Sequence, residues 1–156
     1  MANNLRLDET DRRLLRALQA DGRISNADLA ERCHLSPSAC SERVRRLREA
    51  GFITGFTALV DPEKVERGVL IFVEVMLDRT TPEVFETFAA AARRSPDVLE
   101  CHMVAGGFDY LIKSRVRDLV AWRKFLEEVL VRIPGVRETR TYAVLEEVKS
   151  TTMLPV

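Results

Sequence analysis

The sequence predicts an α+β protein with a helix-turn-helix domain followed by a ferredoxin-like βαββαβ sandwich. The first third of the chain has helical periodicity with short connections, whereas the rest alternates apolar, strand-like runs with two amphipathic helices. A turn pair, Asp61-Pro62, separates these two parts. We therefore expect a helix-turn-helix domain with its connecting strand at residues 1–62 and a second domain at residues 63–156.

The composition is that of an ordinary globular protein. The 156 residues are 46% hydrophobic and 31% charged, and 24 basic residues balance 24 acidic ones. The sequence contains neither a secretory signal at its polar start nor an apolar stretch of about 20 residues. Three cysteines in unrelated contexts argue against a disulfide framework. We expect a cytoplasmic protein that does not contact membranes.

Two capped helices are predicted at the start of the chain. Asp8 and Asp11 have the spacing of an N-cap and its N3 acid, and leucines then recur at helical spacing up to Asp21-Gly22. Ser25 and Asp28 have the same spacing and begin a second helix of about two turns. His34-Leu35-Ser36 then forms a tight turn that leads into a third helix.

A third helix is predicted from Ser36-Pro37 to Gly51, with serine as the N-cap and proline at the first helical position. Cys40, Val44 and Leu47 follow helical spacing and should face the core. The side chains expected to face solvent are Ser38, Glu42, Arg45, Arg46 and Glu49. Arg43 and Arg48 flank the apolar stripe.

After this helix, residues 52–60 are rich in β-branched and aromatic side chains and predict a strand that leaves the helical domain. The second domain begins with a buried strand at residues 69–77, followed by a helix that starts at Pro82. Residues 98–105 and 108–116 predict two strands. Only Gly106-Gly107 separates them, which predicts a two-residue hairpin with positive φ.

Asp118 is expected to cap a second helix, and Pro134-Gly135 to turn the chain into a last strand at about residues 137–145. The resulting order, β-α-β-β-α-β, predicts four antiparallel strands with both helices on one face. The opposite face of this sheet needs a cover, and we expect another subunit to provide it.

The third helix is expected to enter the major groove of double-stranded DNA, with its N-terminal side chains at base edges and Arg45 and Arg46 at phosphates. A charged run on a helix alone is usually a solvated face, but its position after a capped helix and a tight turn favours DNA binding. The predicted DNA-binding residues are Ser36, Ser38, Ala39, Ser41, Glu42, Arg43, Arg45, Arg46 and Arg48.

Several motifs extend this interpretation. The first domain contains Leu7-Asp8, Gly22-Arg23-Ile24-Ser25, Leu35-Ser36-Pro37, Arg43-Val44-Arg45-Arg46-Leu47 and Gly51-Phe52-Ile53. The second contains Glu100-Cys101-His102, Phe108-Asp109-Tyr110-Leu111, Pro134-Gly135-Val136, Thr139-Arg140-Thr141-Tyr142 and Glu146-Glu147-Val148-Lys149. With these motifs the chain resembles the Lrp/AsnC family over nearly its whole length.

The resemblance implies a transcription factor whose DNA binding and assembly respond to a small amino acid, with leucine as a candidate. It also implies homodimers that assemble further, often into octamers on the nucleoid, with the effector bound between dimers. The residues expected at the effector site are Met103, Ala105, Gly106, Gly107, Phe108, Asp109 and Tyr110. Glycines there let a carboxylate approach backbone N–H groups, and Asp109 is expected to face the ammonium group.

One departure from the family bears on the choice of effector: Gly107 stands where the family usually has an acidic residue. A DNA-organising protein that binds DNA without responding to a ligand is the alternative function.

No catalytic residue, metal site or cofactor is predicted. Cys33-His34, Cys40 and Cys101-His102 fit no standard zinc spacing, and the first two cysteines fall on apolar faces. Cys101 and His102 are adjacent in a strand, so they should point to opposite faces of the sheet. We therefore do not expect an enzyme.

Overall fold

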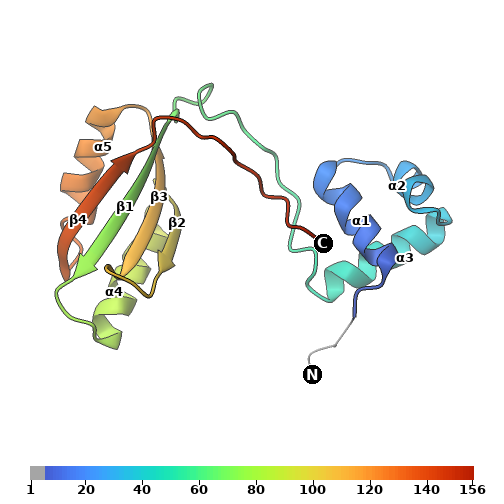
Figure 1. The fold of residues 1–156 in the computed structure, drawn as a ribbon, viewed down its shortest axis with the longest axis horizontal. Helices are drawn as coiled ribbons and strands as arrows, with labels where there is room; N and C mark the ends of the chain where they lie inside the picture. Colours follow the sequence, from blue (N-terminus) through green and yellow to red (C-terminus); the bar gives the residue numbers. More distant parts are fainter. Residues whose placement is uncertain (1–5) are drawn as a thin grey trace. The chain divides into compact units, whose positions relative to one another are not determined.

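A computed structural model describes residues 6–156, apart from the side chain of Val129. The chain divides into two compact units, Met1–Leu59 with Lys149–Val156 and Val60–Val148, and each has its own core (Figure 1). The first unit contains the helices α1 (Glu9–Ala20), α2 (Asn26–Cys33) and α3 (Pro37–Glu49). Among residues 6–156 no helix is both long and apolar enough to cross a membrane.

The three helices of the first unit pack around a small apolar core. Leu14 from α1, Cys33 from α2, and Cys40 and Leu47 from α3 are almost completely inaccessible to solvent. The apolar stripe predicted on α3 is confirmed, although Val44 is only partly buried at its edge. Burial raises the pKa of the Cys33 and Cys40 thiols, so both behave as small core side chains.

Helix α1 begins with the predicted capping box. Asp8 accepts a hydrogen bond from the Asp11 backbone N–H at 2.7 Å, and Asp11 accepts one from the Asp8 backbone N–H at 3.2 Å. The Asp8 carboxylate also accepts a hydrogen bond from Arg43 at 2.7 Å. The backbone N–H of Asp11 and the Arg43 guanidinium together hold the pKa of Asp8 below its usual value.

The turn between α2 and α3 also follows the prediction. Ser25 and Ser36 cap the two helices through the backbone N–H groups three residues later, and Pro37 occupies the first turn of α3. His34 ends α2 in the left-handed conformation, with φ of 55°, a feature that the sequence did not signal.

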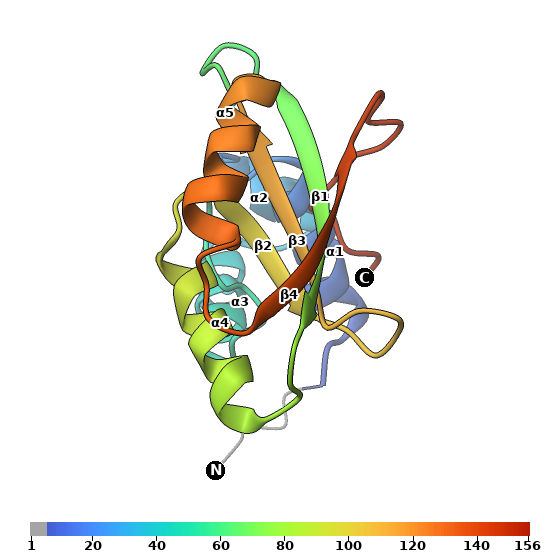
Figure 2. The ribbon, with the colours of Figure 1, turned by 90° about the vertical axis from the view of Figure 1, so that its left-hand side faces the viewer.

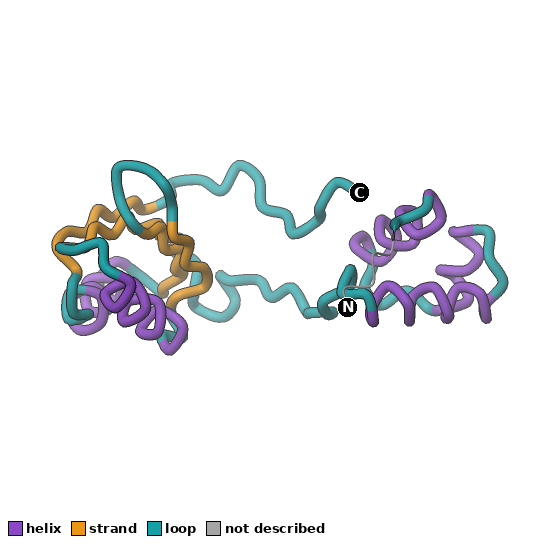
Figure 3. Tube along the Cα trace, turned by 90° about the horizontal axis from the view of Figure 1, so that it is seen from below, coloured by secondary structure: helices purple, strands orange, loops and turns teal. Residues whose placement is uncertain are grey.

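The strand predicted at residues 52–60 does not form. This segment carries neither helix nor strand, and Figure 3 shows it as loop after α3. Its apolar residues Phe56, Leu59 and Val60 are exposed by 53%, 82% and 64%. A strand is stabilised by backbone hydrogen bonds to a neighbouring strand. Here the N–H groups of Phe52 and Ile53 donate instead to the Leu47 carbonyl of α3, and none of the four described strands pairs with the segment.

The second unit confirms the predicted ferredoxin-like order. Its strands are β1 (Val69–Leu77), β2 (Val98–Met103), β3 (Tyr110–Val116) and β4 (Val136–Ala143). They form one antiparallel sheet in the order β2-β3-β1-β4. Helices α4 (Pro82–Arg94) and α5 (Leu119–Phe125) cover the same face of this sheet (Figure 2). Helix α5 continues as a π-helical turn at Leu126–Leu130.

Alternating apolar residues of β1 build the core beneath these helices. Ile71, Val73 and Val75 are inaccessible to solvent and pack against α4 and α5, where Phe88 is also inaccessible. The rings of Phe88 and Tyr110 lie 4.5 Å apart between their centroids.

Gly135 has a conformation that requires glycine. Its φ is 91°, and a Cβ atom built there would lie 2.6 Å from Cγ1 of Val84. We expect Gly135→Ala to lower the free energy of unfolding by about 1–3 kcal/mol, because the substitution adds both backbone strain and a clash. Gly107→Ala is the control, since a Cβ there meets nothing within 4 Å. Urea unfolding of both variants measures the difference, and equal stability would contradict this assignment.

The lowered pKa of Asp8 predicts part of the acid sensitivity of the first unit. Because the folded-state pKa lies below the unfolded value, the stabilisation is present above the unfolded pKa and is lost as pH falls through the folded one. We expect Asp8→Asn to destabilise the protein at neutral pH and to flatten the fall in stability at acid pH. Unfolding measured from neutral to acid pH tests this, with Glu31→Gln as the control. Parallel curves for Asp8→Asn and the native chain would refute it.

Candidate DNA-binding surface and effector loop

One side of α3 presents most of the predicted DNA-binding residues to solvent. Its exposed residues are Ser38, Ala39, Ser41, Glu42, Arg45, Arg48 and Glu49. They occupy the exposed side of the second helix of a helix-turn-helix pair, the helix that reads the major groove in such proteins. Ser36 lies at the start of this side, where its hydroxyl caps the helix.

Arg45 is held by two carboxylates of its own helix. Its guanidinium donates to Glu42 Oε1 and to Glu49 Oε1, each at 2.5 Å. The hydrogen bonds from Arg45 lower the pKa of Glu42. Both acids are exposed, so these pairs contribute little to stability. Arg45 therefore has to exchange its carboxylate partners before it can bind a phosphate.

Arg43 and Arg46 are directed towards α1. Asp11 Oδ1 accepts hydrogen bonds from Arg43 at 2.8 Å and from Arg46 at 3.0 Å, and Asp11 is 1% exposed. The prediction that Arg46 faces solvent is partly correct: its side chain is 40% exposed, but the buried carboxylate of Asp11 draws its guanidinium inward. Capping spacing identified Asp11, but nothing in the sequence showed that it binds two arginines.

Ser41 is also tied to a neighbouring helix. Its hydroxyl donates to Asn26 Oδ1 at 2.9 Å, and Asn26 Nδ2 donates to the Pro37 carbonyl oxygen at 2.9 Å. Asn26 thus links the start of α2 to the start of α3, a role that sequence reasoning missed. Arg48 makes no ion pair within the described part of the chain, which leaves its charge available.

The predicted two-residue hairpin is wrong. Strand β2 ends at Met103 and β3 begins at Tyr110, so residues 104–109 form the loop. Neither Gly106 nor Gly107 has positive φ, and a Cβ on either would meet nothing within 4 Å. The longer loop is closed by a backbone hydrogen bond from the Val104 N–H to the Asp109 carbonyl at 3.0 Å.

Asp109 fastens the loop to the central strand. Its Oδ2 accepts a hydrogen bond from the Leu77 backbone N–H at 2.7 Å, and its own N–H donates to the Val75 carbonyl at 3.0 Å. This gives Asp109 a structural role beside the predicted one.

The structure distributes the predicted effector residues between two hollows. Gly106, Gly107, Phe108 and Asp109 line a hollow of about 340 Å³. Met103 and Tyr110 line another of about 600 Å³, and Ala105 lines neither. The smaller hollow also includes two arginines, Arg79 and Arg137, that sequence reasoning did not select.

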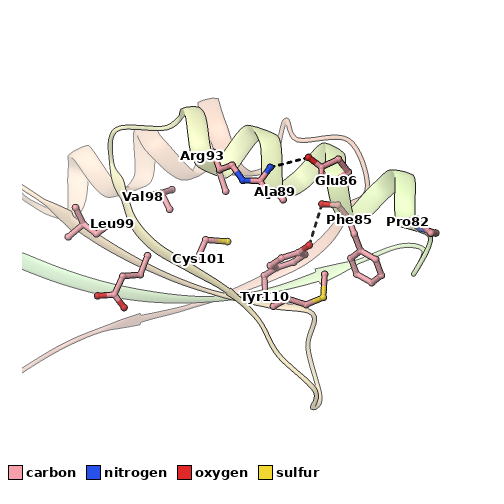
Figure 4. A pocket seen from close by; sticks show the side chains of 12 residues that line it. Pro82, Phe85, Glu86, Ala89, Arg93, Val98, Leu99, Cys101 and Tyr110 are labelled. Atoms are coloured by element: carbon pink, nitrogen blue, oxygen red, sulfur yellow. Dashed lines mark hydrogen bonds and ion pairs between the residues drawn. The ribbon is translucent and has the colours of Figure 1, made fainter. Parts of the chain in front are cut away.

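The larger hollow lies between α4 and β2 (Figure 4). Arg93 pairs with Glu86 at 3.0 Å on one wall, and the Tyr110 hydroxyl donates to the Phe85 carbonyl at 3.3 Å. Cys101 faces this hollow, and burial raises the pKa of its thiol. Most of the other lining residues are apolar.

The Cys101-His102 pair has no arrangement for catalysis. Cys101 lies beneath α4, whereas His102 Nε2 lies 3.2 Å from Glu100 Oε2 and is exposed. Within residues 6–156, no group of three or more His, Cys, Asp or Glu side chains is placed to hold a metal ion.

Comparison with known proteins identifies both units. Residues 70–154 match the Lrp/AsnC ligand binding domain, and residues 7–54 match a winged helix-turn-helix DNA-binding domain. The chain is 53% identical over 148 residues to the leucine-responsive regulatory proteins of Salmonella typhimurium and Escherichia coli K12. These matches cover 95% of this chain and 90% of each relative.

Solved structures of similar regulators support the same family. A transcriptional regulator from Neisseria meningitidis in complex with L-Met has a TM-score of 0.92 and 39% identity, covering 96% of this chain and 97% of that one. AsnC from E. coli has a TM-score of 0.89 and 26% identity, covering 97% and 100%. The relatives are regulators of transcription and not enzymes. The chain belongs to the Lrp/AsnC family and is a ligand-responsive transcriptional regulator with a helix-turn-helix DNA-binding domain and an amino-acid-binding domain.

Proposed function

We propose that this regulator reads specific DNA sequences through α3, and that a small amino acid changes both its assembly and its DNA binding. The observation that carries the proposal is the exposed side of α3, which presents short polar side chains and arginines on the second helix of a helix-turn-helix pair. The protein acts on the nucleoid, in the cytoplasm.

In this proposal the arginines of α3 have different tasks. Arg45 and Arg48 contact phosphates, which supply affinity without reading sequence, while Ser38, Ala39 and Glu42 lie at base edges. Arg43 and Arg46 hold α3 on Asp11, and the exposed part of Arg46 adds positive charge near the backbone. Ser36 and Ser41 support the start of the helix through their hydrogen bonds.

We propose that the effector binds in the smaller hollow, beside the glycines of the 104–109 loop. Arg137 lines this hollow, and its Nη2 donates to the Met76 sulfur at 3.4 Å. A carboxylate between Arg137, Arg79 and the exposed backbone of Gly106-Gly107 would gain charge-assisted hydrogen bonds. The names of the relatives, leucine-responsive proteins and a complex with L-Met, make leucine and methionine the first candidates.

The sheet face opposite α4 and α5 supports a homodimer. On this face Phe72 of β1 is the cross-strand neighbour of Tyr142 of β4, and the Tyr142 side chain is 48% exposed. Leu111 of β3 lies on the same face and is partly buried. A second copy of the sheet would cover these side chains and remove their apolar surface from water. Further association of dimers, into octamers, would repeat the α3 surface and add weak DNA contacts together.

Arg45→Ala is expected to weaken binding to all DNA sequences and to lower the salt slope by about one phosphate contact. Glu49→Gln should have the opposite effect on affinity, because it frees Arg45 and removes a charge that phosphates repel. Fluorescence anisotropy with specific and nonspecific duplexes over a salt series measures both. If the two variants bind like the native chain, Arg45 does not contact DNA.

Substituting one arginine in each hollow tests which of the two hollows binds the effector. A ligand that binds only the folded protein raises its melting temperature, so a panel of amino acids should raise that of the native chain. We expect Arg137→Ala to abolish this shift and Arg93→Ala to keep it. The reverse pattern would place the effector in the larger hollow. No shift of the native chain with any amino acid, together with unchanged DNA binding, would favour the ligand-independent DNA-organising function.

A further inference from the structure

The segment 151–156 packs on α1 of the DNA-binding unit, although the match to the ligand-binding domain extends to residue 154. Gln19 forms a two-way pair with Leu154: its Nε2 donates to the Leu154 carbonyl at 3.0 Å, and its Oε1 accepts from the Leu154 N–H at 2.6 Å. The Gln19 amide thus satisfies both the N–H and the C=O of Leu154. In a sheet, a neighbouring strand would provide these two hydrogen bonds.

A second anchor lies two residues further along. Arg16 Nη1 donates to the Val156 carbonyl at 2.9 Å, and the Val156 side chain packs against the apolar core of the three helices. Between the segment and α1 lies a hollow of about 640 Å³, lined mainly by Arg16, Gln19 and residues 153–156. The contact therefore combines three hydrogen bonds between α1 side chains and the backbone of the segment with partial burial of the Val156 side chain.

We infer that α1 is a docking surface for the extended segment 151–156, and that the docked segment is a second link between the two units. The first link is the stretch between α3 and β1, residues 50–68, in which the structure describes neither helix nor strand. The chain thus leaves this unit after α3 and returns to it after β4. The inference concerns the fold and does not depend on the proposed effector response.

The docking helix is also the helix that positions α3. Near its N-terminus, Asp11 binds Arg43 and Arg46, and near its C-terminus, Arg16 and Gln19 bind the segment. A displacement of the segment would therefore act on α1, the helix that also holds α3 in place. The sensing unit is thereby connected to the DNA-binding surface through the peptide chain as far as the segment, and from there through the hydrogen bonds of α1.

Hydrogen exchange of the full chain tests the inference with two variants, a chain that stops after Ser150 and Gln19→Met. Methionine keeps the length and helix propensity of glutamine but removes both polar atoms. Arg12→Ala, a change on the same helix outside the contact, is the control. A synthetic peptide of residues 149–156 is then added in excess to the shortened chain.

We expect several-fold faster exchange in the second half of α1 for both variants, unchanged exchange in α4, and native exchange for the control. The added peptide should slow exchange in α1 of the shortened chain. Native exchange in α1 of Gln19→Met, or no effect of the peptide, would overturn the inference. So would faster exchange spread equally over α1 and α4, since that pattern reports general destabilisation.

Discussion

The DNA-binding surface depends on one buried carboxylate. Asp11 is 1% exposed, and a carboxylate without water requires charged or hydrogen-bonding partners. It obtains them from the Asp8 backbone N–H and from the guanidinium groups of Arg43 and Arg46. Because the acid belongs to the first turn of α1 and the arginines to the middle of α3, this set of bonds fixes how α3 lies on the domain.

This arrangement compensates most of the positive charge of α3 within the chain itself. Two of the four clustered arginines are committed to Asp11, and a third, Arg45, is neutralised by Glu42 and Glu49. The exposed ion pairs of Arg45 exchange readily, since each contributes little in water. In the proposed mode of DNA binding, Arg45 exchanges its carboxylate partners for phosphates, while Arg43 and Arg46 keep their pairs with Asp11.

Local chemistry in the sequence predicted most of the fold. Helix caps at Asp8, Ser25 and Ser36, and the alternating apolar residues of β1, depend on neighbours in the chain and are readable from spacing alone. Whether residues 52–60 form a strand, and which carboxylate binds Arg46, depend on groups distant in sequence, and local spacing does not show them. Likewise, the loop at residues 104–109 is longer than the predicted two-residue turn because Asp109 accepts a hydrogen bond from β1. No local sequence pattern reveals this contact.

The most direct test of this division of tasks is a crystal structure of the protein bound to operator DNA. The account predicts that Arg45 leaves Glu42 and Glu49 for a phosphate oxygen, while Arg43 and Arg46 remain within hydrogen-bond distance of Asp11. A complex in which Arg46 leaves Asp11 for a phosphate, with Arg45 still paired to its two glutamates, would contradict it.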